Sequence, residues 1–176
     1  LMLLHHARRD SRTDTDGILI PLEEQDRQKW HRDQIVEGVE ILDSALEQRQ
    51  PGPYQIQAAI AALHAGAATA ADTDWCQIMG LYCSLLQYVP SPVVRLNHAV
   101  AVAMARGPAC GLDILNRLEE NPALKEFHLF HAARADLLRR EGRTEAARTA
   151  YQQAIHLSTN QAEQTYLQRR IDQLTG

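Results

Sequence analysis

The chain has 176 residues, which is enough for one domain with a core of its own, and a formal net charge of −4 at pH 7. A nucleic-acid-binding domain normally carries a basic face, so this balance argues against direct binding to DNA. Its three cysteines are odd in number and too sparse for a disulfide framework, and fit a reduced, cytoplasmic protein. Ala, Leu, Gln, Glu and Arg dominate and alternating strand-type runs are lacking, which predicts an all-α fold.

The first thirty residues differ from the rest. Residues 1–9 have the pattern of an apolar helix without a capping residue, and we expect the chain to be a fragment of a longer protein. This segment is too short for a membrane span and lacks the layout of a signal peptide. Residues 10–17 are polar and turn-rich, and residues 21–30 predict a charged helix. Leu22 and Trp30 of that helix are expected to pack on the rest of the chain.

From residue 34 onward the pattern predicts helices in pairs. Residues 34–48 form the second helix of an atypical first copy whose partner is not obvious. Residues 54–64 and 75–87 form the next pair, joined by an unusually long connection. A third pair opens at Ser91-Pro92, because Ser caps a helix well and Pro is favoured at the first helical position.

The last pair is the clearest. Ala135 and Ala147 allow two helices to approach closely, and Tyr151 fills the space between them. Gly142 accepts the positive φ that ends the first helix, and Thr144 is placed to cap the second.

A final helix is predicted over residues 160–174. Asn160 and Glu163 have the spacing of a capping box. Leu167, Ile171 and Leu174 form one apolar stripe, and the opposite face is polar, as the end of a helical array requires.

One three-position pattern recurs in the second helix of each pair. Its spacing of i, i+4 and i+7 is one stripe of a helix, and the copies lie roughly 33 to 40 residues apart, close to the period of tetratricopeptide repeats. The four copies are Gly38/Leu42/Ala45, Ile78/Tyr82/Leu85, Gly111/Leu115/Leu118 and Ala147/Tyr151/Ala154. The sequence thus predicts a tetratricopeptide-like, right-handed solenoid of three to four hairpins over residues 51–176, with a capping helix from residue 160 and an atypical helical segment over residues 1–50.

Few side chains have the spacing of a catalytic or metal site, and no catalytic, cofactor-binding or metal-binding residue is predicted. His128 and His131 lie at i, i+3 but have no third ligand in the pattern, so packing or surface histidines are favoured. The arginines around Arg139 are interleaved with acids, which indicates a solvated mixed-charge face. Cys76 and Cys83 share a helical face and are interpreted as small core residues. The protein is therefore expected not to be an enzyme.

The remaining candidate is a partner-binding groove along the first helices of the hairpins. Projecting the repeat register selects eight residues: Gln57, Ile60, His64, Asn97, Val100, Met104, Asp136 and Arg140. Asn97 falls where peptide-binding arrays use Asn to hydrogen-bond an extended backbone. The alternative is that Asn97 secures a neighbouring helix or loop of this chain, since the paired lysines that clamp a carboxylate are absent from the predicted groove.

Particular residues of the chain, beyond the spacing of its repeats, indicate a family. The chain resembles the C-terminal, tetratricopeptide-like extension of a bacterial subgroup of extracytoplasmic-function (ECF) sigma factors. The segments that carry the resemblance span nearly the whole chain: Ala7-Arg8-Arg9, Asp16-Gly17, residues 22–27 with Trp30, residues 52–55 and 58–65, Thr73-Asp74-Trp75, residues 90–94, Leu96-Asn97, residues 99–103 and residues 131–138. The sigma domains that bind core polymerase and promoter DNA are not in this chain, so none of their residues can be assigned here.

The resemblance implies a regulatory, protein-binding part of a factor that directs RNA polymerase to promoters. Its partner is expected to be the factor's own sigma domains or core RNA polymerase, with DNA contacted only through domains outside this chain and no membrane contact. Two alternatives stay open: a stand-alone adaptor that binds a regulatory peptide, and a small-molecule sensor.

Overall fold

The computed structural model describes residues 1–175, with side chains through 174. Within this range the chain forms helices and turns, and the one strand-like pairing is an isolated antiparallel bridge between Thr13 and Leu19. The all-α prediction is confirmed. The chain divides into two compact units, residues 1–90 and 91–176. The boundary predicted between residues 50 and 51 falls inside the first unit, and Gly176, the last residue of the predicted array, lies outside the described residues.

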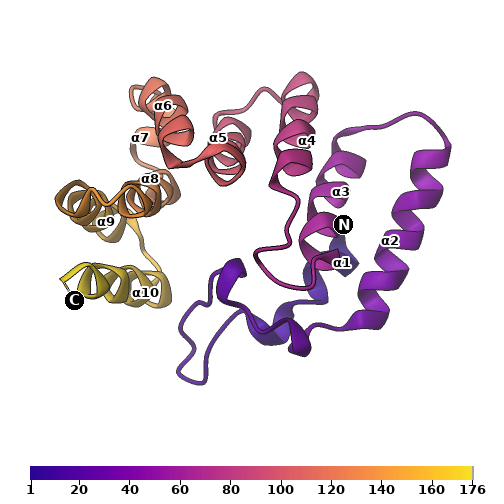
Figure 1. Ribbon diagram of the computed structural model, residues 1–176, viewed down its shortest axis with the longest axis horizontal. Coiled ribbons are helices and arrows are strands. Elements are labelled where there is room, and N and C mark those ends of the chain that lie inside the picture. Colours follow the sequence, from indigo (N-terminus) through magenta and orange to yellow (C-terminus); the bar gives the residue numbers. More distant parts are fainter. Residues whose placement is uncertain (176) are drawn as a thin grey trace. The chain divides into compact units, whose positions relative to one another are not determined.

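The first unit contains four α-helices and three short 3₁₀ turns (Figure 1). The α-helices are α1 (Met2–His6), α2 (Arg32–Glu47), α3 (Pro53–Gly66) and α4 (Trp75–Tyr88). The turns are η1 (Arg9–Ser11), η2 (Leu22–Glu24) and η3 (Arg27–Lys29). Helix α3 packs on both α2 and α4 and lies between them in Figure 1.

The segment 21–30 is not the charged α-helix that the sequence predicts. It forms η2 and η3, separated by Gln25 and Asp26 in extended conformations. The carboxylate of Asp26 accepts a hydrogen bond from the backbone N–H of Gln28, 2.9 Å away. Such local bonds between a side chain and the backbone compete with a continuous helix, which explains the interruption.

Trp30 anchors this irregular segment. Its ring is 3% exposed and belongs to a buried apolar cluster with Leu4, Ala61 and Ala65, against which Leu22 packs. Its indole Nε1 donates to Ser11 Oγ at 2.8 Å, which satisfies the buried polar atom. Both predicted anchors, Leu22 and Trp30, therefore lie against the helices that follow.

Helix α1 is the packing partner of α2 that the sequence did not identify. A Cβ added at Gly38 of α2 would lie 3.0 Å from Leu4 Cγ and 3.5 Å from Leu3 Cβ. The small first position of this triplet is thus explained by the close approach of α1.

Through residue 175, the second unit contains six α-helices and one terminal turn. They are α5 (Pro92–Arg106), α6 (Pro108–Leu118), α7 (Pro122–Lys125), α8 (His128–Arg140), α9 (Thr144–Leu157), α10 (Gln161–Asp172) and η4 (Gln173–Thr175). Helices α5 and α6 pack together, α6 packs on α8, α8 on α9 and α9 on α10. One core runs through them, with Leu115, Leu124, Phe130, Leu137 and Tyr151 among its most buried members.

The predicted helix ends of this unit are confirmed in part. Ser91 caps α5 by accepting from Val94 N, and Gly142 has a φ of +74°. Thr144 is wrong as a cap, because it is already the first residue of α9. Asn160 caps α10, but the Glu163 carboxylate accepts from Ser158 Oγ at 2.8 Å instead of closing the predicted box on the Asn160 backbone.

The recurring triplets lie on the packed faces of their helices. Ala147, Tyr151 and Ala154 are all at most 2% exposed. A Cβ at Gly111 would lie 2.5 Å from Ala103 Cβ and 2.7 Å from the Ala99 carbonyl oxygen, so α6 approaches α5 too closely for a side chain there. The predicted burial of these triplets is therefore confirmed in this unit, whereas the right-handed, tetratricopeptide-like arrangement stays a prediction.

The cysteine interpretation is wrong. Cys76 and Cys83 of α4 are exposed, as is Cys110 of α6. The face that α4 buries carries Ile78 and Leu85 instead, both at most 2% exposed.

Candidate functional site

The first unit contains an apolar groove of about 860 Å³ between α2, α3 and α4. Its lining comes from all three helices and from the loops that join them. The lining residues are Val39, Leu42, Asp43, Leu46, Pro51, Gln55, Ile56, Ala59, Ala62, Leu63, Gly66, Ala67, Asp72, Asp74, Gln77, Leu81, Ser84 and Tyr88. We refer to this hollow as the α2–α4 groove.

The groove exists because α3 is apolar on more than one side. Ala61 and Ala65 belong to the cluster around Trp30. Ile56, Ala59 and Leu63, spaced i, i+3 and i+7, face the groove as a second stripe. A helix that is apolar nearly all round requires contacts on several sides. This double stripe is the signal in the sequence that indicates a groove here, and the sequence reasoning above followed only the repeat register.

The two outer helices leave apolar side chains accessible at the groove. Leu46 of α2 is 42% exposed and Tyr88 of α4 is 51% exposed, and both line it. Large apolar side chains gathered around a concave surface mark sites of contact with other molecules.

The charged groups of the α2–α4 groove are all acidic. Asp43, Asp72 and Asp74 line it and are exposed, and no Lys, Arg or His is among its lining residues in the described part of the chain. Asp72 accepts from the backbone N–H and the hydroxyl of Thr69, at 3.0 and 2.8 Å. Asp74 caps α4 through the N–H of Gln77, at 2.8 Å. Two of the three carboxylates are thus held in place by the backbone.

A second, smaller hollow of about 100 Å³ lies on another side of α3 and includes His64. The His64 ring meets Trp75 edge-on, with centroids 5.1 Å apart. Burial, with a smaller contribution from the positive charges of Arg8 and Arg27, lowers the pKa of His64 to about 4. Arg27 donates to the carbonyl oxygens of His64 and Ala67, at 2.6 and 2.8 Å, and so satisfies the C-terminal end of α3. His64 is part of the packing at this end of α3.

The other residues predicted on α3 also lie off the α2–α4 groove. Gln57 is half-buried, and Ile60 is only 6% exposed and so presents little surface to a ligand. Neither residue lines the groove. The α2–α4 groove is thus a different surface of α3 from the predicted groove, which stays a prediction.

The remaining predicted residues belong to the second unit. Asn97 is exposed on α5, while Val100 and Met104 are half-buried on the same helix. The predicted groove would join these residues to those of α3, which belongs to the first unit, and it stays a prediction.

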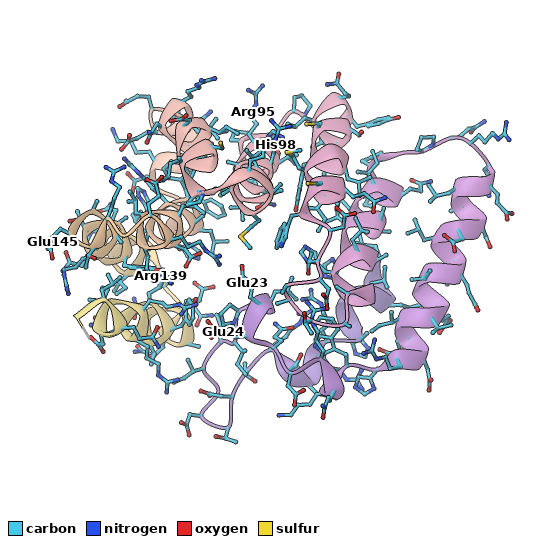
Figure 2. The ribbon with its side chains drawn as sticks, in the orientation of Figure 1. Glu23, Glu24, Arg95, His98, Arg139 and Glu145 are labelled. Carbon is cyan, nitrogen blue, oxygen red and sulfur yellow. The ribbon has the colours of Figure 1, made fainter. Side chains whose placement is uncertain are left out.

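Asp136 and Arg140 are brought together by α8. Arg140 Nε lies 2.7 Å from Asp136 Oδ2, and Arg139 Nη2 lies 2.6 Å from Oδ1. Burial acts to raise the pKa of Asp136, but the hydrogen bonds from Arg140 and Arg139 outweigh it and hold the pKa below its usual value. Figure 2 labels Arg139 on α8 and Glu145 on the neighbouring α9. Both residues belong to the arginine-rich stretch for which the sequence predicts a solvated mixed-charge face. The ion pairs of Asp136 support that interpretation.

His128 and His131 have separate structural roles. His128 Nε2 lies 2.9 Å from a Glu163 carboxylate oxygen, which joins α8 to α10. His131 Nε2 lies 2.8 Å from the Lys125 carbonyl oxygen. Among the described residues no group of three or more His, Cys, Asp or Glu side chains is arranged to hold a metal ion. A search of the same residues for a helix of sufficient length and apolar character to cross a membrane found none.

Comparison with known proteins gives two similarities. Residues 1–46 match a family of unknown function (DUF6596), and this stretch includes most of α2 with its groove-lining residues Val39, Leu42, Asp43 and Leu46. The whole chain is 45% identical over 176 residues to an uncharacterized protein of Rhizobium meliloti (strain 1021). The aligned region is 41% of that protein, so the chain spans about two fifths of its relative's length. No solved structure matches the chain.

Proposed function

We propose that this chain is a regulatory, protein-binding domain of a sigma factor that directs RNA polymerase to particular promoters. The observation that carries the protein-binding role is the α2–α4 groove, a concave apolar surface with exposed Leu46 and Tyr88 beside it. The resemblance to the C-terminal extension of ECF sigma factors supports the link to transcription. In this proposal the groove binds a segment of the factor's own sigma domains or of core RNA polymerase, DNA is contacted by other domains, and the domain acts in the cytoplasm without catalysis of its own.

The test is in vitro transcription by the full-length factor from its cognate promoter with purified core polymerase. Leu46→Lys places a charge at the groove, and Leu46 is exposed enough for the substitution to leave the fold intact. Val36→Lys is the matched control, because Val36 is a 56% exposed apolar residue of the same helix that does not line the groove. We expect Leu46→Lys to change transcript yield severalfold and Val36→Lys to leave it unchanged.

Circular dichroism and thermal melting of both variants establish that they fold like the parent. Equal transcript yields from folded Leu46→Lys, folded Val36→Lys and parent protein would reject the groove as part of this function. If the full-length gene encodes no sigma domains upstream, the stand-alone adaptor replaces the sigma-factor role.

A small-molecule sensor is the second candidate, because the groove volume lies within the range of about 300–1,000 Å³ typical of small-ligand sites. Such sites are mostly apolar with a few polar groups, which also describes this lining. An apolar compound that raises the melting temperature of the parent and of Val36→Lys, but not of Leu46→Lys, would favour this candidate.

A further inference from the structure

The α2–α4 groove has the form of a helix bundle that lacks one helix. Helix α3 forms its floor, and α2 and α4, each packed on α3, form its walls. Small residues, Ala59, Ala62 and Gly66, lie along the floor between the larger side chains of the walls. Because packed helices approach to interaxial distances of about 8–10 Å only where contact residues permit, these small positions, which alternate with Ile56 and Leu63 on the same floor, suit an added helix.

The charges around this floor favour an added helix that carries positive charge. Three aspartates line the groove and no Lys, Arg or His is among its described lining residues; Arg27, which lies outside the lining, is close enough to Asp72 to interact with its charge. Asp72 and Asp74 each use carboxylate oxygens for the backbone, and a carboxylate can accept further hydrogen bonds through its remaining lone pairs. An acidic helix placed here would bring like charges together, whereas Lys or Arg side chains along its flanks would meet opposite charges.

We infer that the α2–α4 groove binds an amphipathic helix whose apolar face lies on α3 and whose flanks are basic. This inference rests on the proposed function, in which the groove binds protein, and it adds the chemistry of the bound segment. The binding mode is an amphipathic helix laid in a hydrophobic groove, with apolar anchors at helical spacing and charges that set specificity.

The direct test uses two synthetic helical peptides with the same Leu/Ala face, one flanked by Lys and Arg and the other by Glu. Each is titrated with the 176-residue chain, and binding is followed by fluorescence anisotropy. We expect the basic peptide to bind and the acidic one to bind at least about tenfold more weakly, with the difference shrinking as salt screens the charges. Equal affinities, or no binding of either peptide, would overturn the inference.

Charge-neutral variants locate the binding site. The triple variant Asp43→Asn, Asp72→Asn and Asp74→Asn removes the three charges while Asn keeps an acceptor for Thr69 and a good cap for α4. The matched control is Asp33→Asn, Glu37→Gln and Glu40→Gln on α2, three acidic residues that do not line the groove. We expect the groove triple to weaken binding of the basic peptide about five- to tenfold, as three partly exposed ion pairs imply, and the control triple to change it by less than about twofold.

Equal weakening by the two folded triples would overturn the inference, because long-range attraction to an acidic protein would then explain the binding. A concentration-dependent dimer in sedimentation experiments that Leu46→Lys abolishes would assign the groove to a second copy of the chain and also overturn it. The transcription test is separate: unchanged transcription with intact peptide binding rejects the sigma-factor role, and altered transcription without peptide binding rejects the basic helix.

Discussion

Tyr151 is the largest fully buried side chain of the second unit and illustrates how single residues hold it together. Its ring is 2% exposed on α9, which packs on α8 and α10, and burial raises the pKa of its hydroxyl to about 12. Tyr151→Ala should lower the free energy of unfolding by about 3–5 kcal/mol, because a large aromatic removed from a core leaves a cavity. Urea unfolding measures this change. Tyr88→Ala, at a 51% exposed tyrosine, is the control, and similar losses for both variants would contradict the assigned packing.

His64 gives the first unit a pH-dependent stability. Burial lowers the folded-state pKa to about 4 from the ordinary 6.5, so between these values the unfolded chain binds more protons than the folded one. The contribution of His64 is therefore fully present above pH 6.5 and is lost as pH falls toward 4. His64→Phe keeps an aromatic ring beside Trp75 but cannot titrate.

Urea unfolding of parent and His64→Phe across this pH range isolates the effect from carboxylates such as Asp136, which titrate in both proteins. We expect the stability difference to be constant above neutrality and to shift in favour of the variant as pH falls below 6.5. A difference that stays constant from pH 7 to 4 would show that His64 does not titrate with a lowered pKa.

Helix packing predicts opposite changes in stability for alanine substitutions at two glycines within helices. Gly111→Ala should destabilise by about 1–3 kcal/mol through overpacking, because its Cβ would lie 2.5 Å from Ala103 Cβ and 2.9 Å from Leu137 Cδ1. Gly80→Ala should stabilise by about 0.5–1 kcal/mol, because nothing lies within 4 Å of its Cβ and Ala favours the helix of α4. Thermal or urea unfolding of both variants is the measurement. Changes of the same sign would contradict the helix register.

At the level of helices, the sequence predicted packing correctly where a helix has one apolar stripe that packs on one neighbouring helix. Ala147 and Tyr151 of α9 lie on such a stripe, and both were placed correctly. The prediction of a helix over residues 21–30 was wrong, because local hydrogen bonds such as the one that Asp26 accepts interrupt the helix that the composition favours. The α2–α4 groove was missed because burial along α3 depends on three neighbouring helices, and a repeat register assigns each helix only one inner face.

The whole chain is mildly acidic, and ion pairs such as those of Asp136 occupy part of its arginine-rich face. We therefore expect the isolated chain not to bind promoter DNA. Electrophoretic mobility and anisotropy assays with duplex DNA check this expectation. A sub-micromolar complex that weakens steeply with salt would contradict it, since that dependence is the signature of phosphate contacts.

We propose that the α2–α4 groove binds a protein segment when the full-length protein is active. The most direct measurement places a photoreactive amino acid at position 46 or at position 36 of the full-length protein and irradiates it with purified core polymerase and promoter. Because Leu46 lines the groove and Val36 does not, we predict a specific crosslink from position 46, mapped by mass spectrometry to a basic, apolar-faced helix of the factor or the polymerase. The absence of any protein crosslink from position 46, or the same crosslinks from both positions, would contradict the account.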